Sequence, residues 1–295
     1  MSTKIEYFKN NFYKENDNLF ILNKDDSYVE NFGKQWRDYR NVQIDSLNNF
    51  SISENYLKDM FFDNLKLIEN KNILEIGSGA GRFTEHIVKK ANFCISVDLS
   101  SAVHHNVSKD ENNIKMIKAD FNELIPDKKF DIVFCRGVLQ HTKNPVESII
   151  KIHSFVKEKG LVVFDIYKMP KIGYLHPKYF FWRPLIKYFI KYENCEKFLI
   201  KNIKLLLKTK RLIKKIFFNS NFISDCFIPV WDYKSKLFLN DNQLENWSIM
   251  DTLDGLYAKY DFPQRYSKII KILKSNNFKI LNSSKNKNFF ITSND

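Results

Sequence analysis

The residues best suited to holding a ligand are three glycines at alternate positions, Gly77, Gly79 and Gly81, which close the apolar run 72–77 and follow it. A glycine has no Cβ atom, so its backbone can turn sharply and a ligand can lie against it. Taken alone, such a trio is equally typical of a tight turn between a strand and a helix that binds nothing. Neighbouring residues must therefore decide between these two interpretations.

Two aspartates end the next two apolar runs, 93–98 and 114–120. Asp98 stands 21 residues after Gly77, where a carboxylate can accept hydrogen bonds from both hydroxyls of a ribose. Asp120 stands where a carboxylate can accept a hydrogen bond from an exocyclic amine. An aspartate at a strand end is often only a helix cap, but the glycines and both acids in register predict a nucleoside-binding site.

The spacing of the glycines indicates which nucleoside is bound. A dinucleotide fingerprint, GxGxxG, needs its third glycine at position 82, but that residue is Arg82 and the glycines read GxGxG. The string EIGSGAG at 75–81 resembles motif I of the class I S-adenosylmethionine-dependent methyltransferases. FDIVFCRGVLQHT at 130–142 resembles the strand and loop that come later in that family.

The resemblance implies S-adenosylmethionine as the cofactor and S-adenosylhomocysteine as the product. In the family pattern, Asp98 matches the ribose-binding acid, and Asp120 with Phe121 matches the adenine-contacting position. The residues that the resemblance assigns to the cofactor are Glu75, Gly77, Ser78, Gly79, Gly81, Asp98, Leu99, Asp120, Phe121 and Arg136. We add Gln35 and Trp36, since an indole can stack on the cofactor while an amide bonds its polar end. An alternative of equal weight is that Trp36 lies in the core and Gln35 on the surface, with no contact to the cofactor.

Outside this core, the sequence is more loosely similar to small-molecule methyltransferases of bacterial surface-polysaccharide and natural-product pathways. The similar strings lie at 32–36, 182–185 and 251–263. This similarity implies O-methylation of a sugar or sugar-phosphate hydroxyl in surface-glycan assembly. Many of those enzymes begin with a zinc-binding cysteine ribbon, but no cysteine precedes Cys94 here, so we expect no metal site. An RNA methyltransferase and a cofactor-binding protein without catalysis are the alternatives.

Methyl transfer to a hydroxyl requires a group that accepts the hydroxyl proton. His141 is the best candidate, because it follows the apolar run 130–137 in a loop at the edge of the sheet where ligands bind in open α/β folds. The alternative is a loop histidine that packs or caps. His176, Asp254 and Tyr257 are rival bases, each with a structural role as the simpler interpretation.

Apolar runs alternate with helix-length segments at 81–91, 100–109 and 144–159, as in right-handed βαβ units of a parallel sheet. The sequence predicts an α/β fold with a Rossmann-like, doubly wound, seven-stranded sheet, mostly parallel, that ends in an antiparallel hairpin. The expected parts are an N-terminal helical cap at 1–70, the cofactor-binding core at 71–167, a helical and aromatic insertion or lid for the acceptor at 168–262, and a closing helix and hairpin at 263–295.

The net charge of +13 is concentrated in the insertion, because residues 168–215 hold 14 Lys and Arg against two Glu. The basic residues Lys197, Lys201, Lys204, Lys208, Arg211 and Lys215 recur at helical spacing. A solvated basic face is the simplest interpretation. The alternatives are an anionic acceptor such as a phosphorylated or nucleotide-linked sugar, an anionic membrane leaflet, and RNA. RNA is disfavoured, because the rest of the chain is nearly neutral and no known RNA-binding module is present.

The chain begins with charged residues and lacks an apolar h-region, so we expect no signal peptide. No apolar run approaches the roughly 18 residues that a spanning helix needs. The four cysteines are widely spaced, and Cys94 and Cys135 lie inside apolar runs. We therefore expect a cytoplasmic protein whose buried thiols stay reduced.

Overall fold

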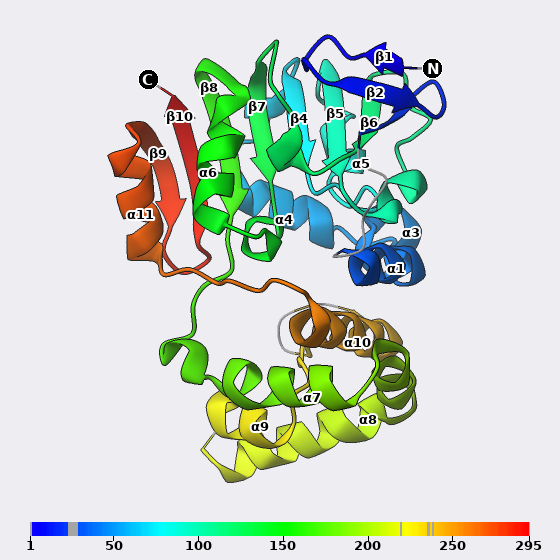
Figure 1. The fold of residues 1–295 in the computed structure, drawn as a ribbon. Coiled ribbons are helices and arrows are strands. Elements are labelled where there is room, and N and C mark those ends of the chain that lie inside the picture. Colours follow the sequence, from blue (N-terminus) through cyan, green and yellow to red (C-terminus); the bar gives the residue numbers. More distant parts are fainter. Residues whose placement is uncertain (1, 23–28, 219, 235–236, 238, 295) are drawn as a thin grey trace. The chain divides into compact units, whose positions relative to one another are not determined.

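The computed structural model describes residues 2–22, 29–218, 220–234, 237 and 239–294, which form two compact units (Figure 1). Unit 1 comprises Met1–Arg40, Ile44–Lys168 and Tyr260–Asp295, and unit 2 comprises Asn41–Gln43 and Met169–Lys259. The bounds of unit 2 lie close to those of the insertion predicted at 168–262.

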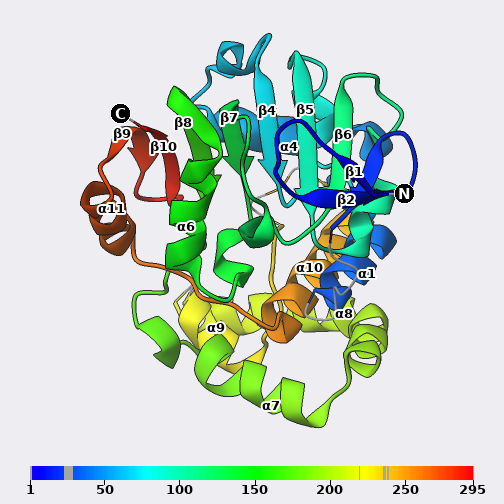
Figure 2. The same cartoon turned by 45° about the horizontal axis from the view of Figure 1, so that its top comes forward.

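A ten-stranded sheet forms the centre of unit 1, with the order β1-β2-β3-β6-β5-β4-β7-β8-β10-β9 (Figures 1 and 2). Its strands are β1 Ser2–Lys4, β2 Asn11–Lys14, β3 Leu19–Ile21, β4 Asn72–Ile76, β5 Phe93–Asp98, β6 Ile114–Lys118, β7 Phe130–Cys135, β8 Val156–Asp165, β9 Phe278–Ser284 and β10 Phe289–Asn294. The strands from β3 to β8 in this order pair in parallel. β10 pairs antiparallel with both β8 and β9. The predicted α/β class, with a mostly parallel sheet and an antiparallel C-terminal hairpin, is confirmed.

The N-terminal segment differs from the predicted helical cap, and the sheet has ten strands among the described residues, not seven. The short strands β1 to β3 extend the sheet, and β3 pairs in parallel with β6. Such short strands show almost no periodicity in sequence. In β2, for example, only Phe12 is buried while its three neighbours are exposed. The helices of this segment begin later, with α1 Glu30–Asp38, α2 Arg40–Gln43, α3 Asp45–Asn48, α4 Ile52–Met60 and the 3-10 helix Leu65–Ile68.

Two of the predicted core helices are much shorter than expected. The segment 81–91 holds only α5, Thr84–Ile87, and the segment 100–109 holds a 3-10 helix, Ser101–His105. The side chain of Asn106 bonds Thr84 Oγ1 and accepts the N–H of Ser108, so it ties these two short segments together. By contrast, α6 Pro145–Ser154 and α11 Tyr266–Ser275 lie where helices were predicted. Pro145 occupies the first turn of α6, as expected for a residue without a backbone N–H.

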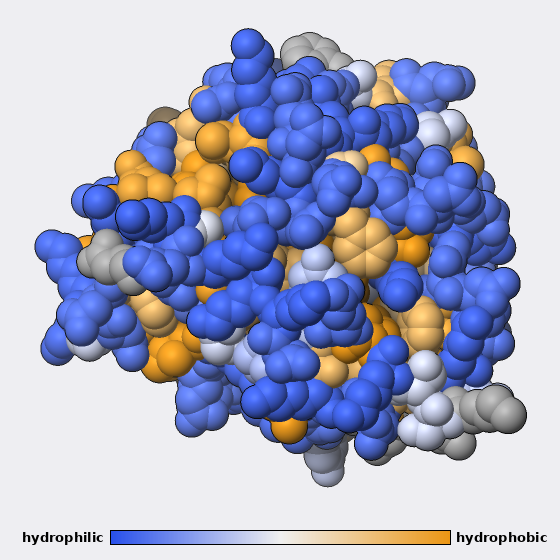
Figure 3. Space-filling model, turned by 90° about the horizontal axis from the view of Figure 1, so that it is seen from above, coloured by the Kyte–Doolittle hydropathy of each residue, from blue (hydrophilic) through white to orange (hydrophobic). Residues whose placement is uncertain are grey.

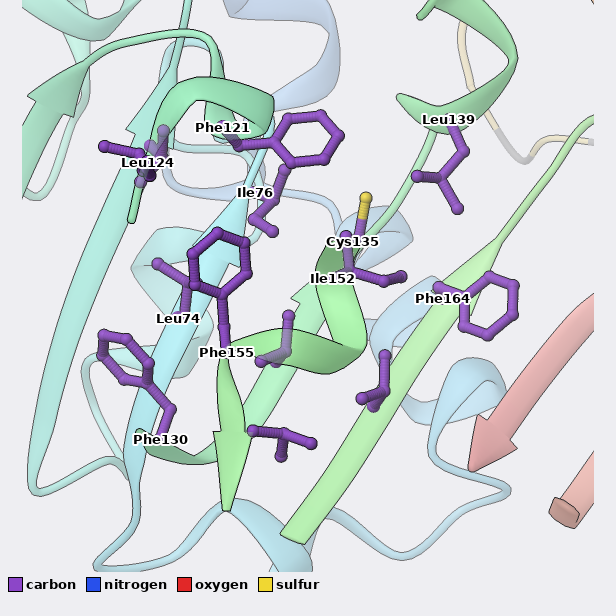
Figure 4. Close-up of a cluster of buried hydrophobic side chains, with 14 of the residues drawn as sticks. Leu74, Ile76, Phe121, Leu124, Phe130, Cys135, Leu139, Ile152, Phe155 and Phe164 are labelled. Atoms are coloured by element: carbon purple, nitrogen blue, oxygen red, sulfur yellow. The ribbon is translucent and has the colours of Figure 1, made fainter. Parts of the chain in front are cut away.

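The parallel strands are buried on both faces, which explains their nearly continuous apolar sequences. Leu74, Ile76 and Cys135 pack on one side with α6 and α11, within the cluster that Figure 4 shows. Alternate residues, including Ile73 and Phe134, pack on the other side with α4 and α5. The face seen in Figure 3 is mostly hydrophilic, with separate hydrophobic areas between polar residues. The core thus fixes the strand ends that carry the polar residues discussed below.

Unit 2 is helical. It contains the 3-10 helix Gly173–Leu175, the π-helix Lys178–Trp182, α7 Arg183–Phe189, α8 Tyr192–Ile216, α9 Asn221–Phe227 and α10 Asp241–Tyr257. A buried lysine, Lys210 of α8, ties α8 to α9 through Asp225 and to the residue after α9 through the carbonyl oxygen of Ile228. Arg183 donates to the carbonyl oxygen of Gly255 at 3.0 Å, which holds α7 against α10. None of the helices in the described parts of the chain has the length and apolar character needed to cross a bilayer.

Candidate active site

The glycine loop after β4 adopts backbone conformations that require glycine. Gly77, Gly79 and Gly81 all have positive φ angles, of 78°, 52° and 96°. A Cβ atom on Gly81 would lie 2.4 Å from Oδ1 of Asn106, which is too close for any side chain. A Cβ atom on Gly79 would lie 3.2 Å from Cδ2 of the Trp36 indole. The positive φ angles and the close approach of Asn106 and Trp36 both require glycine in this loop.

Asp98, at the end of β5, is bonded to this loop. Its Oδ2 accepts the N–H of Gly79 at 2.7 Å, and its Oδ1 accepts the N–H and the hydroxyl of Ser100 at 2.8 Å and 2.6 Å. Burial raises the pKa of Asp98, although the hydrogen bonds from Ser100 and Gly79 oppose that rise. Each carboxylate oxygen has two lone pairs, so Oδ2 can still accept one hydrogen bond from a ribose while the carboxylate holds the loop.

Trp36 and Gln35 lie on α1, and the structure brings this helix to the glycine loop. The indole of Trp36 packs over Gly79 and remains partly exposed, while Gln35 is buried. A Cβ atom on Gly33, one turn earlier, would lie 2.6 Å from Oγ of Ser101, so α1 also packs closely on the segment after β5. The partly exposed ring beside the loop favours a role at the site over a position in the core.

Glu75 is fully buried on β4, at 1% exposure. Its Oε2 accepts hydrogen bonds from the hydroxyls of Thr84 and Ser96, at 2.6 Å and 2.7 Å. Burial raises the pKa of Glu75 to about 7, against these two hydrogen bonds, which lower it. A carboxyl group with this pKa can change its protonation state when a cation comes near.

Buried polar atoms without hydrogen-bond partners gather near the carboxyl ends of β4 and β7, which are neighbours in the sheet. In the part of the chain that the structure describes, these atoms are Glu75 Oε1, Ser78 Oγ, Arg136 Nε and Gln140 Nε2. Buried polar atoms are normally paired, and such exceptions call for an explanation. The carboxyl edge of an open α/β sheet is where ligands bind, so a polar ligand accounts for them.

Asp120 and Phe121 follow β6, the strand next to β5. Asp120 starts a 3-10 helix, Phe121–Glu123, and accepts the N–H of Asn122 at 2.9 Å, so it does act as a cap. Phe121 is buried against Ile76 and its neighbours, as Figure 4 shows. Leu99, directly after Asp98, is half-buried. Asp120 as a cap and Phe121 as a core residue both have structural roles, and these roles account for the two residues without any contact to adenine.

Two arginines flank the same pair of aromatic rings. The guanidinium of Arg136 lies 4.3 Å from the centre of the Tyr56 ring and 5.2 Å from that of Phe83. Arg82 lies 5.3 Å and 5.0 Å from the same centres, and its Nε donates to Ser53 Oγ at 3.0 Å. These distances permit cation–π attraction, which is strong where the cation is desolvated.

Asp165, at the end of β8, is the counter-ion of this arginine pair, and the sequence analysis missed it. Its Oδ1 accepts the N–H of Gly137 at 2.6 Å, and its Oδ2 lies 3.9 Å from Nε of Arg136. Burial raises the pKa of Asp165, while the charge of Arg136 lowers it. Asp165 ends β8 as Asp98 ends β5, so the same rule about strand ends would have found it. Tyr56 and Gln140 carried no such signal.

His141 lies in the 3-10 helix Leu139–His141 that follows β7. Its Nδ1 is 2.8 Å from the carbonyl oxygen of Tyr260, and its ring meets that of Tyr167 edge to face. A carbonyl can only accept, so Nδ1 carries the hydrogen and the neutral ring has its basic lone pair on Nε2. The protein thus fixes the tautomer that a general base acting through Nε2 needs.

Two of the three rival bases, His176 and Tyr257, have structural partners within unit 2. His176 lies 3.6 Å from Asp225. The hydroxyl of Tyr257 donates to the carbonyl oxygen of Ile190 at 3.0 Å, and burial raises its pKa, which opposes loss of its proton. Asp254 is half-buried on α10. The contacts of His176 and Tyr257 favour the structural interpretation of these two residues.

Asp45, Glu85 and His86 are the described residues whose arrangement would suit a metal ion. Their oxygens are already used, because Asp45 accepts the N–H groups of Ser53 and Glu54 at the start of α4, and Glu85 accepts that of Asp45. Burial alone would raise the pKa of Asp45, but His86 and the two backbone bonds outweigh it and lower the pKa. These contacts explain the cluster as a set of hydrogen bonds that join α3, α4 and α5.

Comparison with known proteins places the core in one family. Residues 74–164 match the family model described as a methyltransferase domain. The chain is 27% identical over 128 residues to a ubiquinone biosynthesis O-methyltransferase of Rickettsia bellii, covering 41% of this chain and 52% of that protein. It is 30% identical over 153 residues to malonyl-[acyl-carrier protein] O-methyltransferase 2 of Ilyobacter polytropus, covering 49% and 59%.

Among solved structures, magnesium protoporphyrin IX methyltransferase from Synechocystis is 13% identical with a TM-score of 0.47, covering 91% of this chain and 96% of that one. The chain spans between about half and three fifths of the length of the two curated relatives. The matched residues 74–164 contain the glycine loop, Asp98, Asp120 and His141. Residues 74–164 therefore form a methyltransferase domain, in agreement with the resemblance to methyltransferases seen in the sequence.

Proposed function

We propose that this chain transfers the methyl group of S-adenosylmethionine to a small-molecule acceptor, with S-adenosylhomocysteine as the product. The observation that carries the proposal is the bond between Gly79 and Asp98, which joins the glycine loop to an acid at the neighbouring strand end. The buried polar atoms without partners beside it, such as Glu75 Oε1 and Arg136 Nε, support the same site.

Each part of the cofactor has a chemical counterpart among these residues. Asp98 would accept a hydrogen bond from a ribose hydroxyl, and Asp120 and Phe121 would bind the adenine by polar and apolar contact. Trp36 and Gln35 cover the glycine loop. Glu75 and Ser78 offer oxygens to the ammonium group, and Arg136 offers its guanidinium to the carboxylate. Leu99 continues the loop after Asp98 and adds apolar contact. The bound cofactor supplies a methyl group already activated on a sulfonium.

The remaining tasks of the protein are to align the acceptor and to remove its proton. With the cofactor bound, Nε2 of His141 would take the hydroxyl proton of the acceptor as that oxygen is methylated. Alignment of the reacting atoms can supply several of the roughly 7–11 kcal/mol attributed to proximity. The base adds about 10²–10⁴-fold in rate, which matters most for a weakly acidic alcohol.

For the acceptor, we propose a sugar or sugar-phosphate hydroxyl in surface-glycan assembly, recognised with the help of residues 169–259. The loose similarity at 182–185 and 251–263 and the basic character of that segment support this choice. The two relatives described above are named as O-methyltransferases, which favours oxygen as the accepting atom.

The proposal can be tested by incubating the purified chain with S-adenosylmethionine labelled in its methyl group and with separate pools of sugars and sugar phosphates, phenolic quinone precursors, and RNA. We expect label in the sugar pool, and S-adenosylhomocysteine formed in equal amount. Label in RNA alone would replace the small-molecule assignment by an RNA methyltransferase. Tight cofactor binding without transfer to any pool would make the chain a binding protein.

A further inference from the structure

Helix α8 of unit 2 has apolar side chains on two separate faces. The first face packs against α9 and α10 and is buried (Figure 1). Its apolar members are Tyr192, Cys195, Leu199, Ile203 and Leu207. The second face is exposed to solvent. Its apolar members, with exposed fractions between 55% and 63%, are Phe198, Leu205, Leu212 and Ile216. The second face is therefore not needed for the packing of unit 2.

Lysines run directly beside the exposed apolar row. They are Lys197, Lys201, Lys204, Lys208 and Lys215, and all are exposed. At about 100° per residue, the two rows lie next to each other, opposite the buried face. We call these nine residues the outer face of α8. Among the residues that the structure describes, no ion pair involves Lys201 or Lys208. Arg211 does not belong to this face, because it makes two hydrogen bonds to Asp232.

The chemistry of this face determines what it fits. An exposed apolar row of this length is unusual on a surface that faces only water. Leucine, isoleucine and phenylalanine side chains gain free energy when they enter the boundary between lipid headgroups and acyl chains. Lysines beside them can bury their aliphatic stems and extend their ammonium groups to lipid phosphates. We propose that the outer face of α8 docks on the surface of an anionic lipid bilayer.

Two other occupants fit less well. RNA would use the lysines, but the aliphatic side chains of Leu205, Leu212 and Ile216 have no π-face on which bases can stack. A second copy of this chain, paired about a twofold axis, would bring the lysine row close to its own counterpart, which costs free energy through like-charge repulsion. An anionic bilayer satisfies the apolar row and the lysine row together. This inference does not depend on the proposed methyl transfer.

The full chain can be tested by co-sedimentation with vesicles of phosphatidylcholine alone and of phosphatidylcholine with phosphatidylglycerol. We expect partitioning only onto the vesicles that contain phosphatidylglycerol, and weaker partitioning as salt rises. The double variant Lys201→Gln with Lys208→Gln should partition roughly 30-fold more weakly, since each lysine near an anionic surface is worth about fivefold. Leu205→Ser with Leu212→Ser should lose at least about tenfold, even though its charge is unchanged.

The matched controls are Lys268→Gln with Lys271→Gln, two exposed lysines of α11, and Leu281→Ser, an exposed leucine of β9. These variants should partition like the unchanged chain. Circular dichroism should be the same in all variants. Cofactor affinity should be the same as well, because the proposed cofactor site lies in unit 1. The proposal is overturned if the unchanged chain does not bind anionic vesicles at low salt, or if the leucine variant partitions normally. Binding of RNA, or self-association that the leucine variant abolishes, without vesicle binding, would assign the face to those partners instead.

Discussion

The backbone N–H of Gly79 donates a hydrogen bond of 2.7 Å to Oδ2 of Asp98, so the acid proposed to bind the ribose also holds the glycine loop in place. The two residues come from neighbouring parallel strands, whose carboxyl ends lie at the same edge of the sheet. The positive φ of Gly79 directs its N–H toward the carboxylate. The loop geometry and the ribose contact are therefore coupled, and a change in either residue should affect both.

Asp98→Ala should weaken the binding of S-adenosylmethionine by at least about tenfold. The variant loses a charge-assisted hydrogen bond to the ribose, worth about 1.5–3 kcal/mol, and it also releases the N–H of Gly79. Isothermal titration calorimetry with the cofactor measures the effect. Ser100→Ala is the control, because it removes one internal bond to Asp98 but keeps the carboxylate. Unchanged affinity in folded Asp98→Ala would remove Asp98 from the site.

Gly79→Ala should impair cofactor binding more than its effect on stability explains. At the φ of 52°, an alanine costs about 1–2 kcal/mol, and its Cβ would also press on the Trp36 indole at 3.2 Å. Gly173→Ala is a matched control, because Gly173 has a similar φ of 63° and no atom within 4 Å of its Cβ position. Both variants should lose stability in urea unfolding, Gly79→Ala somewhat more because of Trp36, but only Gly79→Ala should lose affinity. Equal affinity in the two would contradict a close approach of the cofactor at Gly79.

The sequence predicted the parallel core because its strands are buried on both faces and end in turn residues. The predicted runs at 93–98 and 278–284 coincide with β5 and β9. The strands β1 to β3 could not be predicted, because three or four residues show no reliable alternation, and these strands join the sheet only through the pairing of β3 with β6. Tertiary contacts, not local preference, decide such segments.

The residues of the candidate site also fall into those that the sequence could predict and those that it could not. Residues at fixed offsets from a strand end, such as Gly79 and Asp98, were predictable, because the backbone of the strand and turn determines their positions. The position of Trp36 over Gly79 depends on how α1 packs, and the sequence supports it only through the family resemblance. The arrangement of Arg82 and Arg136 around Tyr56 is a long-range contact, and no spacing in one segment indicates it.

Glu75 should make the stability of the protein depend on pH. Its pKa is about 7 in the folded state against 4.5 in the unfolded chain, so the folded state binds the proton more tightly. Stability should therefore fall as pH rises from about 4.5 to 7 and then level off, by up to about 3 kcal/mol. Glu75→Gln removes this dependence, so its stability relative to the unchanged chain should rise from pH 5 to pH 8.

Glu75→Gln must be compared with the unchanged chain, because His153 makes stability depend on pH in the opposite direction. Burial lowers the pKa of His153 to about 4, so its contribution is lost as pH falls below about 6.5. His153 is present in both proteins, and the difference in their free energies of unfolding isolates Glu75. Urea unfolding at several pH values measures this difference. A difference that stays constant from pH 5 to pH 8 would show that the pKa of Glu75 is not raised.

His141→Asn should separate the catalytic role of His141 from its structural one. The side-chain amide of asparagine can stand where Nδ1 stands and donate to the carbonyl oxygen of Tyr260, but it offers nothing in place of Nε2. If Nε2 accepts the acceptor's proton, kcat should fall by about 10²–10⁴-fold, while cofactor affinity and urea stability stay close to those of the unchanged chain.

His141→Gln places an amide near the position of Nε2 and loses the bond to Tyr260. It should lose stability as well as kcat, because an amide cannot take up the proton. A purely structural His141 predicts nearly normal turnover in His141→Asn, whereas the loss of stability in His141→Gln is expected in either case. Rapid-quench measurement of a single turnover, with labelled cofactor and saturating acceptor, distinguishes the two because it reports the transfer step itself.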